Sequence, residues 1–164
     1  MPGTTLFGLG SAHGDDQVGW LIVDAIAAEA ETLTAPVTVR HLKSPIDLVH
    51  DLEGCDRVVI CDACRTESPL GTLHRWEWPT SEIAATRAAG SHDFSLPDTF
   101  NLAAQLGRLP QAVVVWGIDG VNFSGGAEMS PELRNLIPQL ARQIFFRDIV
   151  TSPRPAEPMR CHDA

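Results

Sequence analysis

Short runs of consecutive apolar, β-prone residues alternate along the chain with longer stretches in which apolar residues recur every three or four positions. Consecutive apolar residues are typical of strands buried on both faces, and the wider spacing is typical of helices with one buried face. The expected strands are residues 4–9, 36–42, 57–61, 72–78 and 111–116. The expected helices run from 16 to 28, from 44 to about 54, from 95 to about 107 and from 130 to 145.

Strands that alternate with helices predict an α/β fold. Right-handed crossovers then give a three-layer sandwich, in which a mainly parallel, twisted sheet of about five strands has helices on both faces. Bulky and charged residues alternate in 72–78, which favours a half-exposed strand at an edge of the sheet. We expect one domain over residues 1–150, and a disordered tail over the proline-rich residues 151–164.

Charge and hydropathy narrow the classes of partner. The 164 residues include 12 Lys and Arg against 21 Asp and Glu, for a formal net charge of -9. This charge disfavours binding to nucleic acid or to anionic membranes. No apolar run approaches the roughly 20 residues of a membrane-spanning helix, and the N-terminal residues lack the pattern of a secretory signal. A cytoplasmic protein is therefore expected.

The cysteines do not form a recognisable framework. Cys55, Cys61, Cys64 and Cys161 are too few for a disulfide framework in a chain of this length. A reducing cytosol would also keep them as thiols. Cys61 and Cys64 have the spacing of a redox motif, but Pro69 and Gly71 follow closely and favour a loop over the helix that such a motif opens. A zinc site would have to recruit scattered histidines. We expect ordinary, half-buried thiols.

The stretch 8–19 joins the first strand to the first helix and contains several glycines and two adjacent carboxylates. Gly8 and Gly10 suggest a dinucleotide fingerprint, but His13 stands where its third glycine would be. Asp15 and Asp16 would also face the pyrophosphate at the start of the helix and repel it. Nucleotide binding is therefore disfavoured.

Three polar side chains are expected to meet at one edge of the sheet. Asp16 follows the first strand, Asp62 follows the third, and His92 precedes a helix that must begin near the same edge. Taken singly, each has a structural explanation, such as a helix cap, a turn or a surface residue. Together, two carboxylates and one imidazole predict a site for a divalent cation with open coordination positions.

Four motifs carry a resemblance to a known family. They are GLGS followed by DDQVG in residues 8–19, a strand ending in Asp before PLGT in residues 58–72, SHDFSL in residues 91–96, and WGIDG followed by MSP in residues 116–131. In this order the chain resembles, over about residues 4–147, the hydrogenase maturation endopeptidases. This family removes the C-terminal extension of the [NiFe]-hydrogenase large subunit after nickel has been inserted.

The chain departs from the family pattern at three positions, with Ser11 for Asn, Gln17 for Gly and Gly120 for Pro. The resemblance implies that Asp16, Asp62 and His92 contact nickel, which the substrate carries, and that other divalent ions can occupy the same site. Its partner would be the large-subunit precursor, bound by a monomer. Asp15 is expected to be a cap or to support Asp16.

The resemblance leaves the cleavage step to be derived from the residues. No serine or cysteine is paired in sequence with a convincing His and Asp. The hypothesis is attack by water, activated by the metal or by Asp16 or Asp62 as general base, in an aspartic-type endopeptidase. Two alternatives are a noncatalytic, nickel-dependent checkpoint protein for the large subunit and an unrelated metallohydrolase for small substrates.

Overall fold

The computed structural model describes residues 3–32, 37–85, 87–88 and 95–150. Its strands are β1 (Thr4–Leu9), β2 (Val37–Leu42), β3 (Arg57–Arg65), β4 (Leu73–Glu77), β5 (Arg87–Ala88) and β6 (Ala112–Asp119). Its α-helices are α1 (Val18–Ala30), α2 (Leu48–Asp51), α3 (Leu96–Gln105) and α4 (Pro131–Ile144). The other helical turns are η1 (Gly14–Gln17), η2 (Pro45–Asp47), η3 (Glu82–Ala85) and the π-helical η4 (Phe145–Val150).

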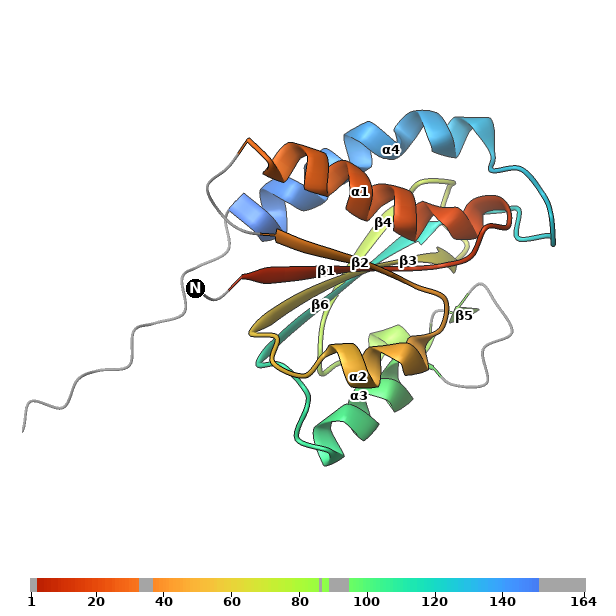
Figure 1. Cartoon of the computed structure of the whole chain (residues 1–164). Coiled ribbons are helices and arrows are strands. Elements are labelled where there is room, and N and C mark those ends of the chain that lie inside the picture. The colour runs from red at the N-terminus through yellow and green to blue at the C-terminus, as the bar shows by residue number, and fades with distance from the viewer. Residues whose placement is uncertain (1–2, 33–36, 86, 89–94, 151–164) are drawn as a thin grey trace, which may run out of the picture.

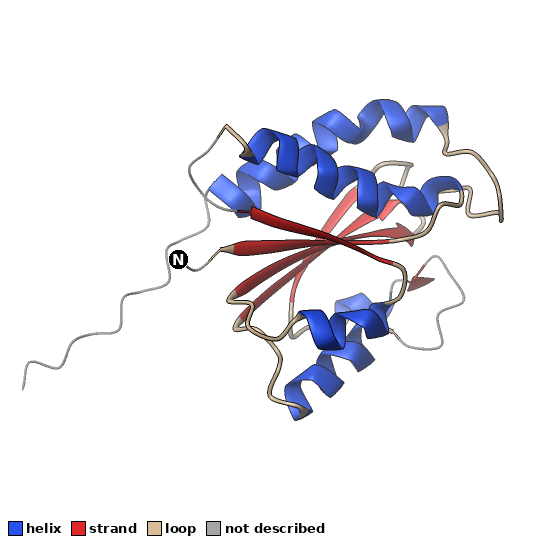
Figure 2. Cartoon of the chain, in the orientation of Figure 1, coloured by secondary structure: helices blue, strands red, loops and turns tan. Residues whose placement is uncertain are grey.

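The strands form one sheet between two layers of helices, with α1 and α4 on one face and α2 and α3 on the other (Figures 1 and 2). The strand order is β2-β1-β3-β6-β4, and β5 pairs with β3 beside this path. Strands β2, β1, β3 and β6 run parallel, whereas β4 is antiparallel to β6 and β5 is antiparallel to β3. The predicted α/β sandwich is confirmed, as is the edge position of β4.

Strands β3 and β6 are longer than their apolar runs, and β6 continues past Trp116 to Asp119. Strand β3 was expected to end at Cys61, and the segment from Cys61 to Cys64 was expected to be a loop. That expectation is wrong, because β3 stays paired with β6 as far as the Cys64–Asp119 pair. The apolar pattern stops at Asp62, but the backbone N–H and C=O groups of residues 62–64 can pair with β6 whatever their side chains are.

The two faces of β3 bury different side chains, because successive residues of a strand point to opposite sides. Val59 and Cys61 pack in the core under α1 and α4, whereas Val58 and Ile60 pack in the core over α2 and α3. Cys61 and Cys64 therefore lie on opposite faces and cannot pair as a redox dithiol. Both are buried more deeply than expected, with 0% and 4% of their surface exposed.

The predicted start of α3 is confirmed, since the backbone N–H of Asp98 donates to Ser95 Oγ at 3.2 Å and caps the helix. Two other expectations, the position of His92 and the tail over residues 151–164, lie outside the described residues. Within the described part of the chain, every helix is too short or too polar to cross a membrane.

Candidate functional site

The candidate site lies where the carboxyl ends of β1 and β3 meet. These strands are neighbours in the sheet. After β1 the chain forms β2 on one side of this pair, and after β3 it forms β4 and β6 on the other side. A crevice at such a switch point is the usual place for function in an open α/β sheet. Asp16 lies in η1, after β1, and η1 contacts β3, which carries Asp62.

Glycines in residues 8–19 allow this close approach. A Cβ atom at Gly19 would lie 2.5 Å from the carbonyl oxygen of Cys61 and would also overlap that of Leu9. A Cβ atom at Gly10 would overlap the carbonyl oxygen of Asp16. The glycines therefore bring η1 and α1 against β1 and β3, which gives them a packing role at this edge.

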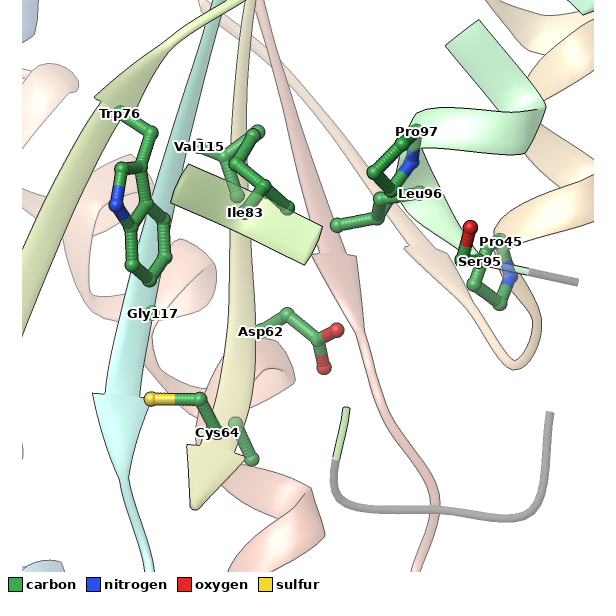
Figure 3. Close-up of a pocket in the computed structure, with 11 residues that line it drawn as sticks. Pro45, Asp62, Cys64, Trp76, Ile83, Ser95, Leu96, Pro97, Val115 and Gly117 are labelled. Atoms are coloured by element: carbon green, nitrogen blue, oxygen red, sulfur yellow. The ribbon is translucent and has the colours of Figure 1, made fainter. Parts of the chain in front are cut away.

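The Asp62 side chain lines a small, mainly apolar pocket between the sheet and α3 (Figure 3). The cavity has a volume of about 90 Å³. It is lined by Pro45, Asp62, Ala63, Cys64, Trp76, Ile83, Ser95, Leu96, Pro97, Val115 and Gly117. Such a cavity has room for an apolar side chain or a few atoms of a peptide beside one carboxylate.

Burial and charge both act on Asp62. The residue is half-buried, and the surrounding protein atoms, first, and the negative charge of Asp16, second, raise the pKa of Asp62 well above its ordinary value. Asp16 itself is only 8% exposed. The fold thus brings together two of the three predicted residues. His92 is not described, but Ser95, three residues later, lines the same pocket as Asp62.

Asp15 is fully buried and holds a distant loop. Its Oδ2 atom accepts hydrogen bonds from the backbone N–H groups of Val121 and Asn122, at 2.9 and 3.0 Å, and from Ser130 Oγ at 2.8 Å. Its Oδ1 atom accepts from the backbone N–H of Ser130 at 2.7 Å. Of its two expected roles, support of the site is the one that these contacts favour.

The same contacts set the acidity of Asp15. Burial acts to raise its pKa, but the hydrogen bonds from Asn122, Val121 and Ser130 together outweigh burial and hold the pKa of Asp15 below its ordinary value. The carboxylate form therefore stabilises the fold at pH values above the ordinary Asp pKa. That contribution is lost as the pH falls through the lowered value.

Replacing Asp15 with Asn is expected to destabilise the protein by about 2 kcal/mol at pH 7, since one oxygen becomes an amide that faces backbone donors. The stability difference from the wild type should shrink in acid. Urea unfolding at pH 7 and pH 3 measures both effects, with the exposed Asp56 changed to Asn as a control. Equal losses of stability at the two pH values would contradict this role.

Sequence reasoning missed a cluster beside the pocket, formed by Cys64, His74 and Asp119. The alternation in residues 72–78 does place His74 on the same face as Trp76, but the order of strands is not visible in the sequence. Reasoning from the chain alone therefore gave no reason to join His74 to Asp119 or to Cys64.

Comparisons with known proteins agree with the fold. The family model described as HycI, hydrogenase maturation protease, matches residues 43–146. No curated protein matches the chain in sequence. The solved structure of the hydrogenase maturating endopeptidase HybD from E. coli superposes with a TM-score of 0.67 and 21% identity, over 87% of this chain and 89% of that one.

Two archaeal structures give similar values. The [NiFe] hydrogenase maturation protease HycI from Thermococcus kodakarensis KOD1 has a TM-score of 0.67 and 19% identity, over 88% of this chain and 91% of that chain. HybD from Thermococcus kodakarensis has a TM-score of 0.63 and 20% identity, over 86% and 95%. At these identities the structures establish the shared fold, while the family model spans more than half of the chain. The chain therefore belongs to the hydrogenase maturation protease family, and it is a hydrolase that acts on peptide bonds.

Proposed function

We propose that this protein removes the C-terminal extension of a [NiFe]-hydrogenase large-subunit precursor after nickel has been inserted. In this proposal Asp16, Asp62 and His92 contact the nickel, which arrives with the substrate. The observation that carries the proposal is that η1, which holds Asp16, packs against β3, which holds Asp62 beside the pocket. Burial, and the charge of Asp16 second, accordingly raise the pKa of Asp62.

The coupling explains why the metal would license cleavage. Two carboxylates held close together, and partly shielded from water, are unfavourable when both are ionised. A cation supplied by the substrate would offset both charges, whereas a precursor without nickel would leave them uncompensated. Binding energy is thereby tied to the metal content of the precursor. Other divalent ions would satisfy the same charges.

Asp62 is the better candidate for the general base, because it lines the pocket beside which a peptide would lie, whereas Asp16 is not among the residues that line it. Water would add to the scissile carbonyl carbon while Asp62 takes its proton. The proton then passes to the amide nitrogen, which leaves as a free amine. This support for water attack agrees with the cysteines, since burial raises the pKa of the Cys61 and Cys64 thiols and leaves them weak nucleophiles.

Membership of a peptidase family favours cleavage over a noncatalytic checkpoint role. We propose that the enzyme is a cytoplasmic monomer with one domain over residues 1–150. It would bind neither a nucleotide nor a membrane. The net charge of -9 supports a partner that is neither nucleic acid nor an anionic lipid surface.

The test is to incubate nickel-loaded and nickel-free precursor with the protein and to measure the mass of the product. Only the nickel-loaded precursor should be shortened. Asp16→Ala, Asp62→Ala and His92→Ala should each abolish processing, whereas Asp56→Asn and His50→Ala, which alter exposed residues, should process normally. Full processing by all three site variants, or equal cleavage of the nickel-free precursor, would overturn the proposal.

A further inference from the structure

Three donor groups of different chemistry converge beside the pocket but outside the nickel-contact set. One ligand atom each from Cys64, His74 and Asp119 lie within 4.8 Å of one another. We propose that these three residues form a second metal site, which holds one resident divalent cation of the zinc class. This ion would belong to the protein itself, so the proposal does not depend on the recognition of nickel in a substrate.

The fold places the three residues on neighbouring strands. Cys64 of β3 pairs with Asp119 of β6, and His74 of β4 pairs with Gly117 of β6. All three side chains share the face of the sheet that carries Trp76 and Val115, because residues two apart on a strand point the same way. The cluster thus spans three strands at the carboxyl-end edge of the sheet.

Gly117 leaves the space that the cluster needs. A Cβ atom at this position would lie 3.1 Å from Cys64 Sγ and 2.8 Å from a ring atom of Trp76. The contact with Trp76 is closer than a real Cβ atom makes and the contact with Cys64 Sγ is tight, so a larger residue at position 117 would force the indole, and to a lesser extent the sulfur, to shift. In Figure 3 the sulfur of Cys64 points towards β6, into this space.

Partners hold Asp119 and His74 in place, as is usual for metal ligands in proteins. Asp119 is 1% exposed and accepts hydrogen bonds from the backbone N–H of Thr66 at 2.7 Å and from Thr66 Oγ1 at 2.8 Å. Nε2 of His74 donates to Asp119 Oδ2 at 2.6 Å, and the His74 ring stacks on Trp76 with centroids 5.6 Å apart. A bound ion would replace the contact between His74 and Asp119 with two coordinate bonds.

The donor set indicates the class of cation. Sulfur, imidazole nitrogen and carboxylate oxygen together suit a borderline ion such as Zn²⁺, and three protein ligands leave a fourth tetrahedral position open. Asp119 needs positive charge, since its ion-pair partner among the described residues is His74 alone, which is charged only when protonated. Asp62 lies two residues before Cys64 on β3, about 7 Å away along the strand, so the ion would border the substrate pocket.

Metal binding to the purified full-length chain tests the site. After treatment with a chelator, the protein is titrated with Zn²⁺ in a calorimeter and with Co²⁺ in a spectrophotometer. We expect one ion per chain to give a sulfur-to-cobalt charge-transfer band, which distinguishes it from any ion held by the carboxylates of Asp16 and Asp62. Cys64→Ser should remove the band, and His74→Ala should weaken Zn²⁺ binding by more than ~100-fold.

Matched controls separate this site from the other candidates. Cys55→Ser and His50→Ala should bind Zn²⁺ as the wild type does. Asp16→Asn and His92→Ala should keep the sulfur-to-cobalt band of the wild type. Circular dichroism shows whether each variant folds. A folded wild-type protein that binds no stoichiometric metal would overturn the proposal. Binding that survives Cys64→Ser but fails in Asp16→Asn would also overturn it.

The two proposals fail separately. Loss of nickel-dependent cleavage is measured on the precursor mass, while the second site is measured by ion stoichiometry and the cobalt spectrum of the protein alone.

Discussion

Replacing Asp148 with Asn is expected to destabilise the protein by about 3 kcal/mol at pH 7, the lower end of the cost of breaking a buried ion pair. Asp148 is 1% exposed and accepts hydrogen bonds from Arg57 and Arg75, at 2.8 Å each, and from the indole N–H of Trp116 at 2.7 Å. It joins η4 to three strands of the sheet. The lower end applies because the two arginine side chains are 21% and 22% exposed, and water still reaches them.

The effect should depend on pH. Burial acts to raise the pKa of Asp148, but hydrogen bonds from Arg75 and Trp116 and the charges of Arg75 and Arg57 outweigh it and lower the pKa. The contribution of the carboxylate is therefore present above the ordinary Asp pKa and lost as the pH falls through the lowered value. The stability difference between Asp148→Asn and wild type should accordingly be smaller at pH 3 than at pH 7 in urea unfolding.

Glu77 provides the matched control, because it also binds Arg75, at 2.8 Å, but its side chain is 69% exposed. Glu77→Gln should cost less than about 1 kcal/mol. If Asp148→Asn and Glu77→Gln lost similar amounts of stability, burial would not be what makes the Asp148 network strong.

Most of the fold could be predicted from the sequence, because each helix and strand has its own local pattern of apolar and polar residues. Strand β1 covers the residues 4–9 that its apolar run predicted, and the edge position of β4 followed from its alternation. Local patterns failed where polar residues continue a strand. Asp62 interrupts the apolar run of β3 and Asp119 is the last residue of β6, yet both stay paired within the sheet.

The candidate site could be predicted from the sequence only in part. The rule that function lies beyond the carboxyl ends of parallel strands brought Asp16 to Asp62, and the structure places the two within electrostatic reach. The metal cluster and the Asp148 network were not readable, because they join residues far apart in sequence. Arg57 lies 91 residues before Asp148, and the strand order that unites His74 with Asp119 is a property of the whole sheet.

Asp62→Asn is expected to abolish processing of the nickel-loaded precursor and, at the same time, to make the metal-free protein more stable by about 1 kcal/mol at pH 7. Burial and the charge of Asp16 raise the pKa of Asp62 in the folded state. Stability is therefore greatest below the ordinary Asp pKa and decreases as the pH rises through the raised value. Asparagine stays neutral and keeps an oxygen for the hydrogen bond from the backbone of Ala63, so it escapes this decrease.

The pH dependence separates relief of charge from a general improvement in packing. Thermal unfolding of wild type and Asp62→Asn should give the same stability at pH 3, where both side chains are neutral, and should diverge as the pH rises. Asp56→Asn, at an exposed position, should stay within about 0.5 kcal/mol of wild type throughout. A variant less stable than wild type at pH 7 would contradict the electrostatic cost. Since a cation removes the same cost, added Ni²⁺ should stabilise wild type by more than it stabilises Asp62→Asn, which ties the instability of the empty site to its affinity for metal.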